Sequence, residues 1–234
     1  MKSMFSKGLL LCFTIAFLAT AGPAGAQSVR HTRGAKKNAA GGVTAGRGTV
    51  VKGANGGEVA HGAAIATNGQ GGAVAARGTS VNGPNGGTAA RGSYIAKDGQ
   101  GNVKSGSAAA FHGPNGAQGS RRSSTRINSD GSASHQGSLE ASGQKGSIQS
   151  SGSAQRDANG NISGQRTTTA QSANGGTYDR TRTYGNGTAT QTTDVTGKSG
   201  NTYQGQTTYT KGEGVQHTQV CKDASGNEIP CKKP

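Results

Sequence analysis

Large hydrophobic residues are scarce in this sequence, and tryptophan is absent from all 234 positions. After residue 26 leucine occurs once, at Leu139, and most valines and isoleucines stand alone. A chain with so few large apolar side chains cannot bury enough surface to build a thick globular core. The composition therefore excludes a compact domain organised around a conventional hydrophobic core.

Acidic residues are also scarce, at 10 against 25 lysines and arginines, so the formal net charge is +15. Residues 1–26 contain two lysines and no acidic residue, so the chain without them keeps a charge of +13. The basic residues are spread along the whole chain rather than gathered at one point. This distribution favours non-specific attraction to polyanions over a single shaped site.

Catalytic and metal-binding signatures are missing as well. There is no Gly-x-Ser-x-Gly elbow, the five histidines stand in unrelated local contexts, and no segment has the ligand spacing of an EF-hand. Gly197-Lys198-Ser199 resembles the end of a phosphate-binding loop, but Thr192 stands where the first glycine of that loop is required. We therefore expect no catalytic residue, no cofactor and no metal site.

The first 26 residues have the three-part pattern of a secretory signal peptide. Lys2 and Lys7 precede an apolar run over residues 9–18, and Ala24-Gly25-Ala26 supplies small residues for cleavage. No later segment approaches 18 consecutive apolar residues, so we expect no integral membrane anchor. The sequence predicts export to the periplasm, the cell surface or the extracellular space.

Glycine is abundant, at 43 residues, and it recurs at a fixed spacing. Clusters such as Asn82-Gly83-Pro84-Asn85-Gly86-Gly87 supply residues that adopt a positive φ at low cost, as tight chain reversals require. The period is 15 residues over 41–176, with Asn161 as the one position that departs from glycine, and about 13 residues over 177–220. The glycines that mark the two series are Gly41, Gly56, Gly71, Gly86, Gly101, Gly116, Gly131, Gly146 and Gly176, then Gly187, Gly200, Gly214 and Gly226.

The segments between these turns are rich in Ala, Val, Ile, Thr and Ser, which predicts an all-β, elongated repeat array in the form of an antiparallel β-meander. Branched residues on both sides of a turn, such as Val50 with Val59 and Ile65 with Val74, are expected to face each other. A parallel β-solenoid is an alternative, because many units hold a glycine near their middle where the chain could bend. A largely disordered chain is another alternative, since the composition is polar and rich in glycine. The turn style is similar to that of Gly/Asn-rich repeats in bacterial surface and matrix proteins, a resemblance of composition alone.

The two ends of the array differ from its repeats. Residues 27–40 are basic, lack acidic residues and show no periodicity, so we expect a flexible basic arm. Residues 221–234 contain Cys221 and Cys231 on either side of a turn, which predicts a disulfide that clamps the C-terminal end of the sheet. His217 lies close to Cys221, but with Cys231 it would give only three soft ligands for a metal.

Tyrosines and arginines alternate in the segment over residues 177–220. Period-2 alternation places Tyr178, Arg180, Arg182 and Tyr184 on one face of a strand, and Tyr203 and Tyr209 on one face of another. This Tyr/Arg face is a candidate binding platform, and the alternative interpretation is that the tyrosines stabilise a thin sheet by packing over their neighbours.

These features predict an exported, non-enzymatic repeat protein of the cell surface or extracellular matrix. Its expected partners are anionic polymers such as acidic polysaccharide, lipopolysaccharide or extracellular DNA. A self-assembling fibre or biofilm component is the first alternative, because the open edges of a thin sheet could pair between molecules. A secreted enzyme or toxin, built from residues that are distant in the sequence, is the second.

Overall fold

The computed structural model of the chain describes residues 27–231. The predicted signal peptide at residues 1–26 lies outside this part. Within it, no helix is long and apolar enough to cross a membrane.

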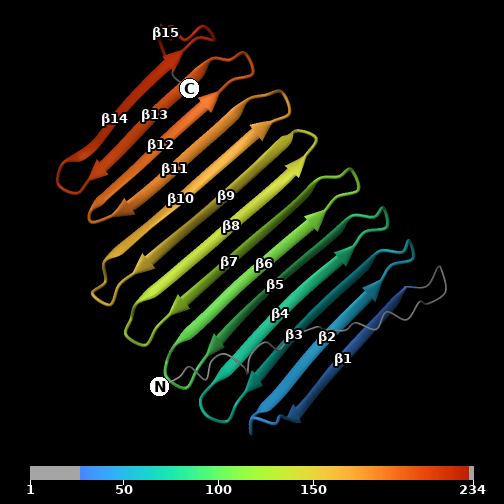
Figure 1. The fold of residues 1–234 in the computed structure, drawn as a ribbon. Coiled ribbons are helices and arrows are strands. Elements are labelled where there is room, and N and C mark those ends of the chain that lie inside the picture. The colour runs from blue at the N-terminus through green and yellow to red at the C-terminus, as the bar shows by residue number, and fades with distance from the viewer. Residues whose placement is uncertain (1–26, 232–234) are drawn as a thin grey trace.

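Fifteen strands form one antiparallel sheet in which each strand lies beside its neighbours in the sequence (Figure 1). The prediction of an all-β meander is confirmed, and the parallel solenoid is wrong because every neighbouring pair runs antiparallel. The strands are β1 (Ser28–Lys37), β2 (Val43–Lys52), β3 (Glu58–Thr67), β4 (Ala73–Asn82), β5 (Thr88–Lys97), β6 (Val103–His112), β7 (Gln118–Ile127), β8 (Ala133–Gly143), β9 (Gly146–Arg156), β10 (Ile162–Ser172), β11 (Thr177–Gly185), β12 (Thr188–Thr196), β13 (Thr202–Thr210), β14 (Gly214–Lys222) and β15 (Glu228–Ile229).

The glycine spacing in the sequence corresponds to the turns of the sheet. Most connections contain five residues, and the fourth of them is a glycine with positive φ, as at Gly56 with φ 80° and Gly86 with φ 81°. In these turns the first residue donates its N–H to the carbonyl of the fifth, as Gly83 does to Gly87 at 2.7 Å. The fourth residue donates back to the carbonyl of the first, as Gly86 does to Gly83 at 3.2 Å. A side chain at the fourth position would be strained in this conformation, which explains the glycine period.

Two connections contain only two residues and shift the pattern of faces. The loop between β11 and β12 is Asn186-Gly187, where both residues have positive φ, as a two-residue hairpin turn requires. The loop between β8 and β9 also leaves only two residues outside the ladder, because Gly143 pairs with Gly146. A five-residue loop joins residues of the same parity across the ladder, whereas a two-residue loop joins odd to even. Each short loop therefore exchanges the odd and even residues between the two faces of the sheet.

The prediction of a flexible arm at residues 27–40 is wrong. Ser28–Lys37 form β1, and every residue of it pairs with β2, from Ser28 opposite Lys52 to Lys37 opposite Val43. Backbone hydrogen bonds make this ladder, so it does not need the alternating side chains that the segment lacks. β1 is the edge of the sheet and is exposed along its whole length, and its basic residues are typical of a protected edge strand.

The predicted pairing of branched residues is wrong at two turns. Val59 lies opposite Val51 rather than Val50, and Ile65 lies opposite Ala75 rather than Val74. An offset of one residue moves a side chain to the other face of a strand. Val50 and Val74 therefore lie on the face opposite to Val59 and Ile65.

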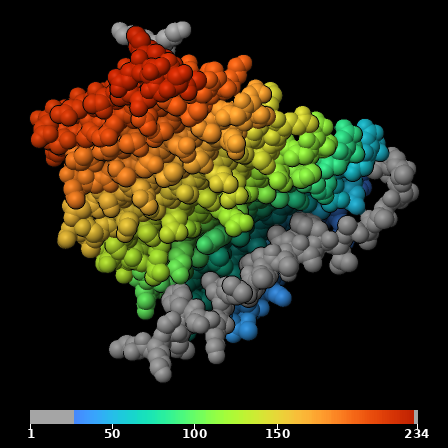
Figure 2. Space-filling view, turned by 45° about the horizontal axis from the view of Figure 1, so that its top comes forward, coloured from blue at the N-terminus to red at the C-terminus, as the bar shows by residue number. Residues whose placement is uncertain are grey.

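The sheet is a single layer, and Figure 2 shows its strands as consecutive bands of colour from blue to red. Among the described residues, Ala60 is the one buried hydrophobic residue and Ser150 is the one buried polar residue. The backbone ladder and the cross-strand side-chain pairs therefore supply most of the stabilisation. Mid-strand glycines remain paired in the ladder. Gly62 on β3 pairs with Gly78 on β4, which in turn pairs with Gly92 on β5.

Aromatic side chains cover glycines on neighbouring strands. Tyr94 on β5 pairs with Gly106 on β6, and a Cβ added to Gly106 would lie 2.5 Å from the Tyr94 ring. Tyr184 covers Gly164 in the same way, since a Cβ there would lie 2.5 Å from Tyr184 Oη. Such contacts bury part of each aromatic ring on a sheet that has no second layer.

Candidate functional site

The two faces of the sheet have different charges. We call one of them the arginine face, formed by the odd-numbered residues of β1–β8, the even-numbered residues of β9–β11 and the odd-numbered residues of β12–β15. The other is the hydroxyl face, because Ser, Thr and Gln dominate it from β8 onward. The basic residues of the arginine face are Arg33, Lys37, Arg47, Arg77, Arg91, Lys97, Arg121, Arg156, Arg166, Arg180 and Arg182.

No strand residue of the arginine face within the described chain is acidic. The acidic residues of the strands all lie on the hydroxyl face, where Lys52 Nζ and Glu58 Oε2 form an ion pair at 3.3 Å. Between residues 27 and 231, none of the arginines on the arginine face is paired with a carboxylate. These acidic residues of the hydroxyl face are Glu58, Glu140, Asp179, Asp194 and Glu228.

The arginines lie in two rows that cross the middle of the strands. In one row Arg33 lies opposite Arg47, and Arg77 follows two strands after Arg47 with Ala63 between them. In the other, Arg91 and Arg121 lie on either side of Ala109. Strand spacing of about 4.8 Å puts two arginines of one row about 10 Å apart when one strand separates them.

Apolar rows run on both sides of these arginine rows. With the exception of Tyr94 and Val220, the large hydrophobic side chains exposed in the described chain lie on the arginine face. Ile95 is 54% exposed and Phe111 is 48% exposed, so these rows are open to solvent. One row crosses the whole sheet through Val29, Val51, Val59, Val81, Ala89, Phe111, Gly119, Ala141, Ile148, Ala170, Tyr178, Val195, Tyr203, Cys221 and Ile229.

The residues of the predicted Tyr/Arg face all lie on the arginine face. β12 separates the two strands that carry them and places Val195 between Tyr178 and Tyr203. It also places Ala189 between Tyr184 and Tyr209. The structure therefore brings Tyr178, Arg180, Arg182, Tyr184, Tyr203 and Tyr209 together on one surface.

Neighbouring polar groups hold the two arginines of this group. Arg182 Nε donates to Gln191 Oε1 at 2.6 Å, and Arg180 Nη2 donates to the same oxygen. Arg180 Nε is shielded from solvent and has no hydrogen-bond partner within the described chain. Because Tyr184 also covers Gly164, packing accounts for part of this surface, as the alternative interpretation expects.

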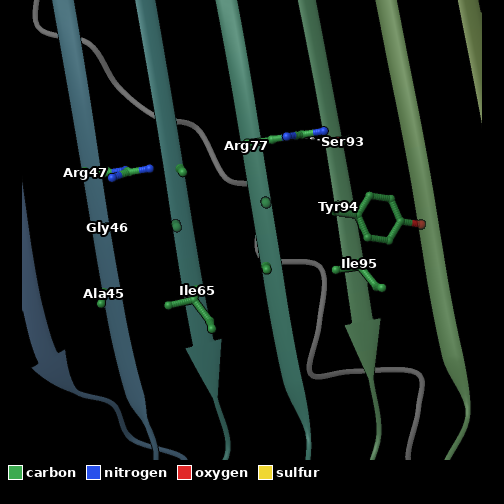
Figure 3. Close-up of a pocket in the computed structure, with 12 residues that line it drawn as sticks. Ala45, Gly46, Arg47, Ile65, Arg77, Ser93, Tyr94 and Ile95 are labelled. Atoms are coloured by element: carbon green, nitrogen blue, oxygen red, sulfur yellow. Dashed lines mark hydrogen bonds between the residues drawn. The ribbon is translucent and has the colours of Figure 1, made fainter.

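Three hollows on the arginine face were not predicted from the sequence, and one of them, of about 490 Å³, is lined by polar and basic residues that include His31, Arg33 and His61. The other two also have apolar linings. The first has a volume of about 650 Å³ and is lined by Arg47, Arg77, Ile65 and Ile95, which Figure 3 shows on β2 to β5. Arg77 Nε donates to Ser93 Oγ at 3.2 Å at its side. The second has a volume of about 460 Å³, with Arg91 and Arg121 among its lining residues. Glu140 also borders it, from a position whose side chain belongs to the hydroxyl face.

A longer period in the sequence could have identified these arginines. Arg47 and Arg77 are 30 residues apart, as are Arg91 and Arg121. Two 15-residue units make one hairpin, so equivalent positions on one face and one edge recur after 30 residues. His31 and His61 follow the same period, and their Nδ1 atoms lie 3.0 Å from Thr49 Oγ1 and Thr79 Oγ1.

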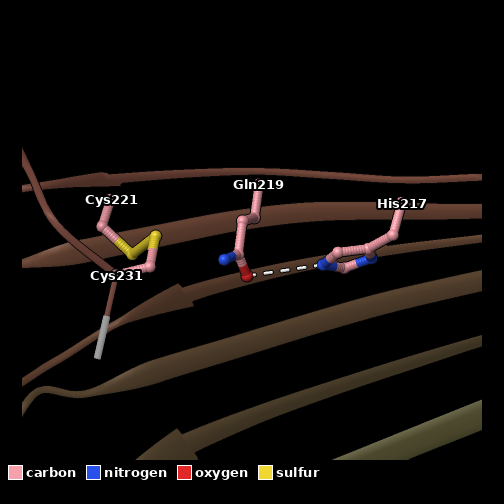
Figure 4. Close-up of a disulfide and its surroundings, with 4 residues drawn as sticks. All are labelled: His217, Gln219, Cys221 and Cys231. Carbon is pink, nitrogen blue, oxygen red and sulfur yellow. Dashed lines mark hydrogen bonds between the residues drawn. A yellow bond between two sulfur atoms is a disulfide. The ribbon is translucent and has the colours of Figure 1, made fainter. Parts of the chain in front are cut away.

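Cys221 and Cys231 form the predicted disulfide, with their Cα atoms 5.3 Å apart (Figure 4). The bridge ties β14 to the residues after the two-residue strand β15. His217 lies on β14, where its Nδ1 is 2.9 Å from Thr207 Oγ1. In the part of the chain that the structure describes, no three His, Cys, Asp or Glu side chains are grouped so that they could hold a metal.

Carboxylates in the turns accept local hydrogen bonds. Asp98 Oδ1 accepts the backbone N–H of Gln100 and of Asn102, each at 2.9 Å, and Asp98 Oδ2 accepts Asn102 Nδ2 at 2.7 Å. The Asn102 side chain is the main reason that the pKa of Asp98 is lowered from 3.8. The pKa values of Asp157 and Asp223 are lowered in the same way, mainly by Asn161 and Asn227.

Comparison of the chain with protein-family models, with curated proteins and with solved structures gives no match in any of the three. Function is therefore inferred from the geometry and charge of the sheet itself.

Proposed function

We propose that the protein is an exported, non-enzymatic adhesive of the cell surface or extracellular matrix, and that its arginine face binds anionic polymers. One observation carries the proposal: the arginine face presents basic side chains from β1 to β11 and no acidic residue on any strand. A polyanion that crosses the strands would meet guanidinium groups without meeting a repelling carboxylate. Acidic polysaccharide, lipopolysaccharide and extracellular DNA all have the required charge.

The rows of arginines suit an extended ligand better than a compact one. Arg47, Arg77, Arg91 and Arg121 lie near the middle of their strands and spread over β2 to β7. Guanidinium groups bind phosphate and carboxylate by paired hydrogen bonds, and each such contact displaces counterions from the polymer. Binding through many such contacts weakens steeply as salt is added.

The export part of the proposal is supported by the disulfide. Bridges of this kind form and persist in oxidising compartments, such as the periplasm and the extracellular space. Cys221 and Cys231 are bridged, which agrees with an oxidising environment. The N-terminal sequence pattern adds independent support.

Heparin and duplex DNA columns test the proposal. The mature chain is loaded at low salt and eluted with a salt gradient, beside a scrambled chain of the same composition and charge. We expect the native chain to elute at a higher salt concentration, because the fold gathers the arginines on one face. Retention equal to that of the scrambled chain would show that the fold adds nothing to binding.

Edge-to-edge self-assembly is a second candidate. β1 presents a free edge of ten exposed residues, to which the edge of another molecule could add. Two features oppose it: β1 carries Arg30, Arg33, Lys36 and Lys37, and β15 covers part of the opposite edge. Seeded growth with fibre diffraction tests this candidate, and a chain that stays monomeric at high concentration rules it out.

A further inference from the structure

The two hollows of the arginine face that have apolar linings are related by a local two-fold axis. The axis is perpendicular to the sheet and passes between Gly78 on β4 and Gly92 on β5, which pair directly. Rotation by half a turn exchanges β4 with β5, β3 with β6 and β2 with β7. In the registers of these strands it superposes Arg77 on Arg91, Ala63 on Ala109 and Arg47 on Arg121.

The same rotation exchanges the apolar residues of the hollows. Ile65 superposes on Phe111, and Ile95 superposes on Val81. Both hollows therefore have the same plan, with an alanine between two arginines and large apolar side chains along one side. The same combination of paired arginines and apolar side chains therefore occurs twice on this face.

Each hollow offers two kinds of contact to a ligand. Within residues 27–231, no hydrogen bond or ion pair engages the side chains of Arg47, Arg91 and Arg121, and Arg77 uses only Nε, toward Ser93. Beside these guanidinium groups, Ile65 is 50% exposed and Phe111 is 48% exposed. A purely hydrophilic polyanion would satisfy the arginines and leave the apolar side chains in water.

We infer that each hollow binds an anionic amphiphile, so that one chain holds two. The phosphate or carboxylate head lies between the paired arginines, and the adjoining alkyl chain lies on the alanine and along the apolar side. The inference deepens the proposed function and rests on it, because it uses the same face. It also explains why apolar rows accompany the arginine rows. Among the anionic polymers proposed above, binding of an amphiphile favours those that carry lipid.

Octyl phosphate is the probe, with inorganic phosphate as the head group alone and octyl glucoside as the same chain without charge. Isothermal titration at low salt is expected to give two octyl phosphate molecules per chain. Both controls are expected to bind at least tenfold more weakly. Equal binding of inorganic phosphate or of octyl glucoside would overturn the inference.

Lysine substitutions at the two alanines distinguish binding within the hollows from general electrostatic attraction. A63K fills the first hollow and adds a positive charge, so the number of bound octyl phosphate molecules is expected to fall from two to one. A63K with A109K is expected to abolish binding. The matched controls A66K and A108K place the same side chain on the hydroxyl face of the same strands, outside the lining of either hollow, and are expected to keep both molecules bound.

Far-UV circular dichroism verifies that each variant keeps the sheet. Unchanged octyl phosphate binding in folded A63K/A109K would overturn the inference, whereas stronger retention of that variant on heparin agrees with it. If the native chain binds heparin better than its scrambled control but binds no octyl phosphate, the inference fails and the proposed function stands. If heparin retention equals that of the scrambled chain, the proposed function fails.

Vesicles distinguish the source of the amphiphile. Phosphatidylcholine vesicles with 30% phosphatidylglycerol are sedimented with the native chain beside vesicles of phosphatidylcholine alone. Co-sedimentation with the anionic vesicles assigns the head groups to a lipid surface. Binding of octyl phosphate without co-sedimentation assigns the hollows to free amphiphiles.

Discussion

At the scale of single residues, Asp98, Asp157 and Asp223 begin their turns and accept backbone and asparagine N–H groups. These bonds favour the ionised carboxylate, so the pKa of each is lower in the folded chain than the ordinary 3.8. A lowered pKa contributes stability that is present above the unfolded value and is lost as the pH falls through the folded value. The turns therefore make the sheet sensitive to acid.

The first prediction concerns the melting temperature between pH 5 and pH 2. We expect the melting temperature of the native chain to decrease as the pH drops below about 4. We expect the melting temperature of the triple variant D98N/D157N/D223N to decrease less. Asparagine already occupies the same turn position in the native chain, where Asn38 Oδ1 accepts the N–H of Ala40 at 3.1 Å and of Gly42 at 3.0 Å. Thermal melts of both proteins check this, and parallel acid profiles would contradict it.

The second prediction concerns glycines beneath aromatic rings. A Cβ at Gly164 would lie 2.6 Å from the backbone oxygen of Ser153 as well as against Tyr184, so G164A is expected to destabilise by about 1–3 kcal/mol. G106A is expected to cost less, because its close contacts are all with the movable Tyr94 side chain. G34A is the control, since nothing lies within 4 Å of its added Cβ. Urea unfolding measures all three, and equal costs at Gly164 and Gly34 would contradict the packing.

At the scale of elements, the turns were predictable and the registers were not. Positive φ is a local conformational requirement that glycine satisfies at low cost. The spacing of the glycines in the sequence therefore located the turns directly. Face and register depend instead on whether a loop contains five residues or two, and the loops at Gly143–Gly146 and Gly185–Thr188 exchange the faces. β1 was missed because its ladder depends on β2 rather than on its own side-chain pattern.

The residues of the candidate site also differ in whether the sequence alone could group them. Tyr178, Arg180, Arg182 and Tyr184 lie on a single strand, so alternation alone was enough to place them on one face. Arg47 and Arg77 meet at a hollow only because β2, β3 and β4 pair in a particular register. A pattern within one strand cannot supply that information, although the 30-residue recurrence could have suggested it.

The third prediction concerns the C-terminal element. β15 pairs with β14 at only two positions, so the disulfide is expected to hold it in place. C221S/C231S is expected to remove about 2–3 kcal/mol from the local stability of this end in the chain-entropy model. Hydrogen exchange should accelerate in β13–β15 and remain unchanged in β1–β4, because each strand contacts only its neighbours. Faster exchange along the whole sheet would contradict this local role.

At the scale of the whole molecule, the sheet has two open faces and almost no interior. One face combines exposed apolar rows with arginines that have no carboxylate partner within residues 27–231, and the other holds the acidic residues of the strands. Exposed apolar rows of this kind are typical of interaction sites. We propose that binding depends on the face that carries the arginines rather than on net charge.

The most direct test compares two variants with the same change in charge. R47Q/R77Q/R91Q removes three arginines from the arginine face, and R30Q/R122Q/R126Q removes three from the hydroxyl face. Binding to duplex DNA is measured over a range of salt concentrations. We expect the first variant to reduce the slope of log K against log salt by about 3, roughly one for each arginine, and the second to leave the slope nearly unchanged. Equal reductions in the two variants would contradict the claim that the arginine face is the binding surface.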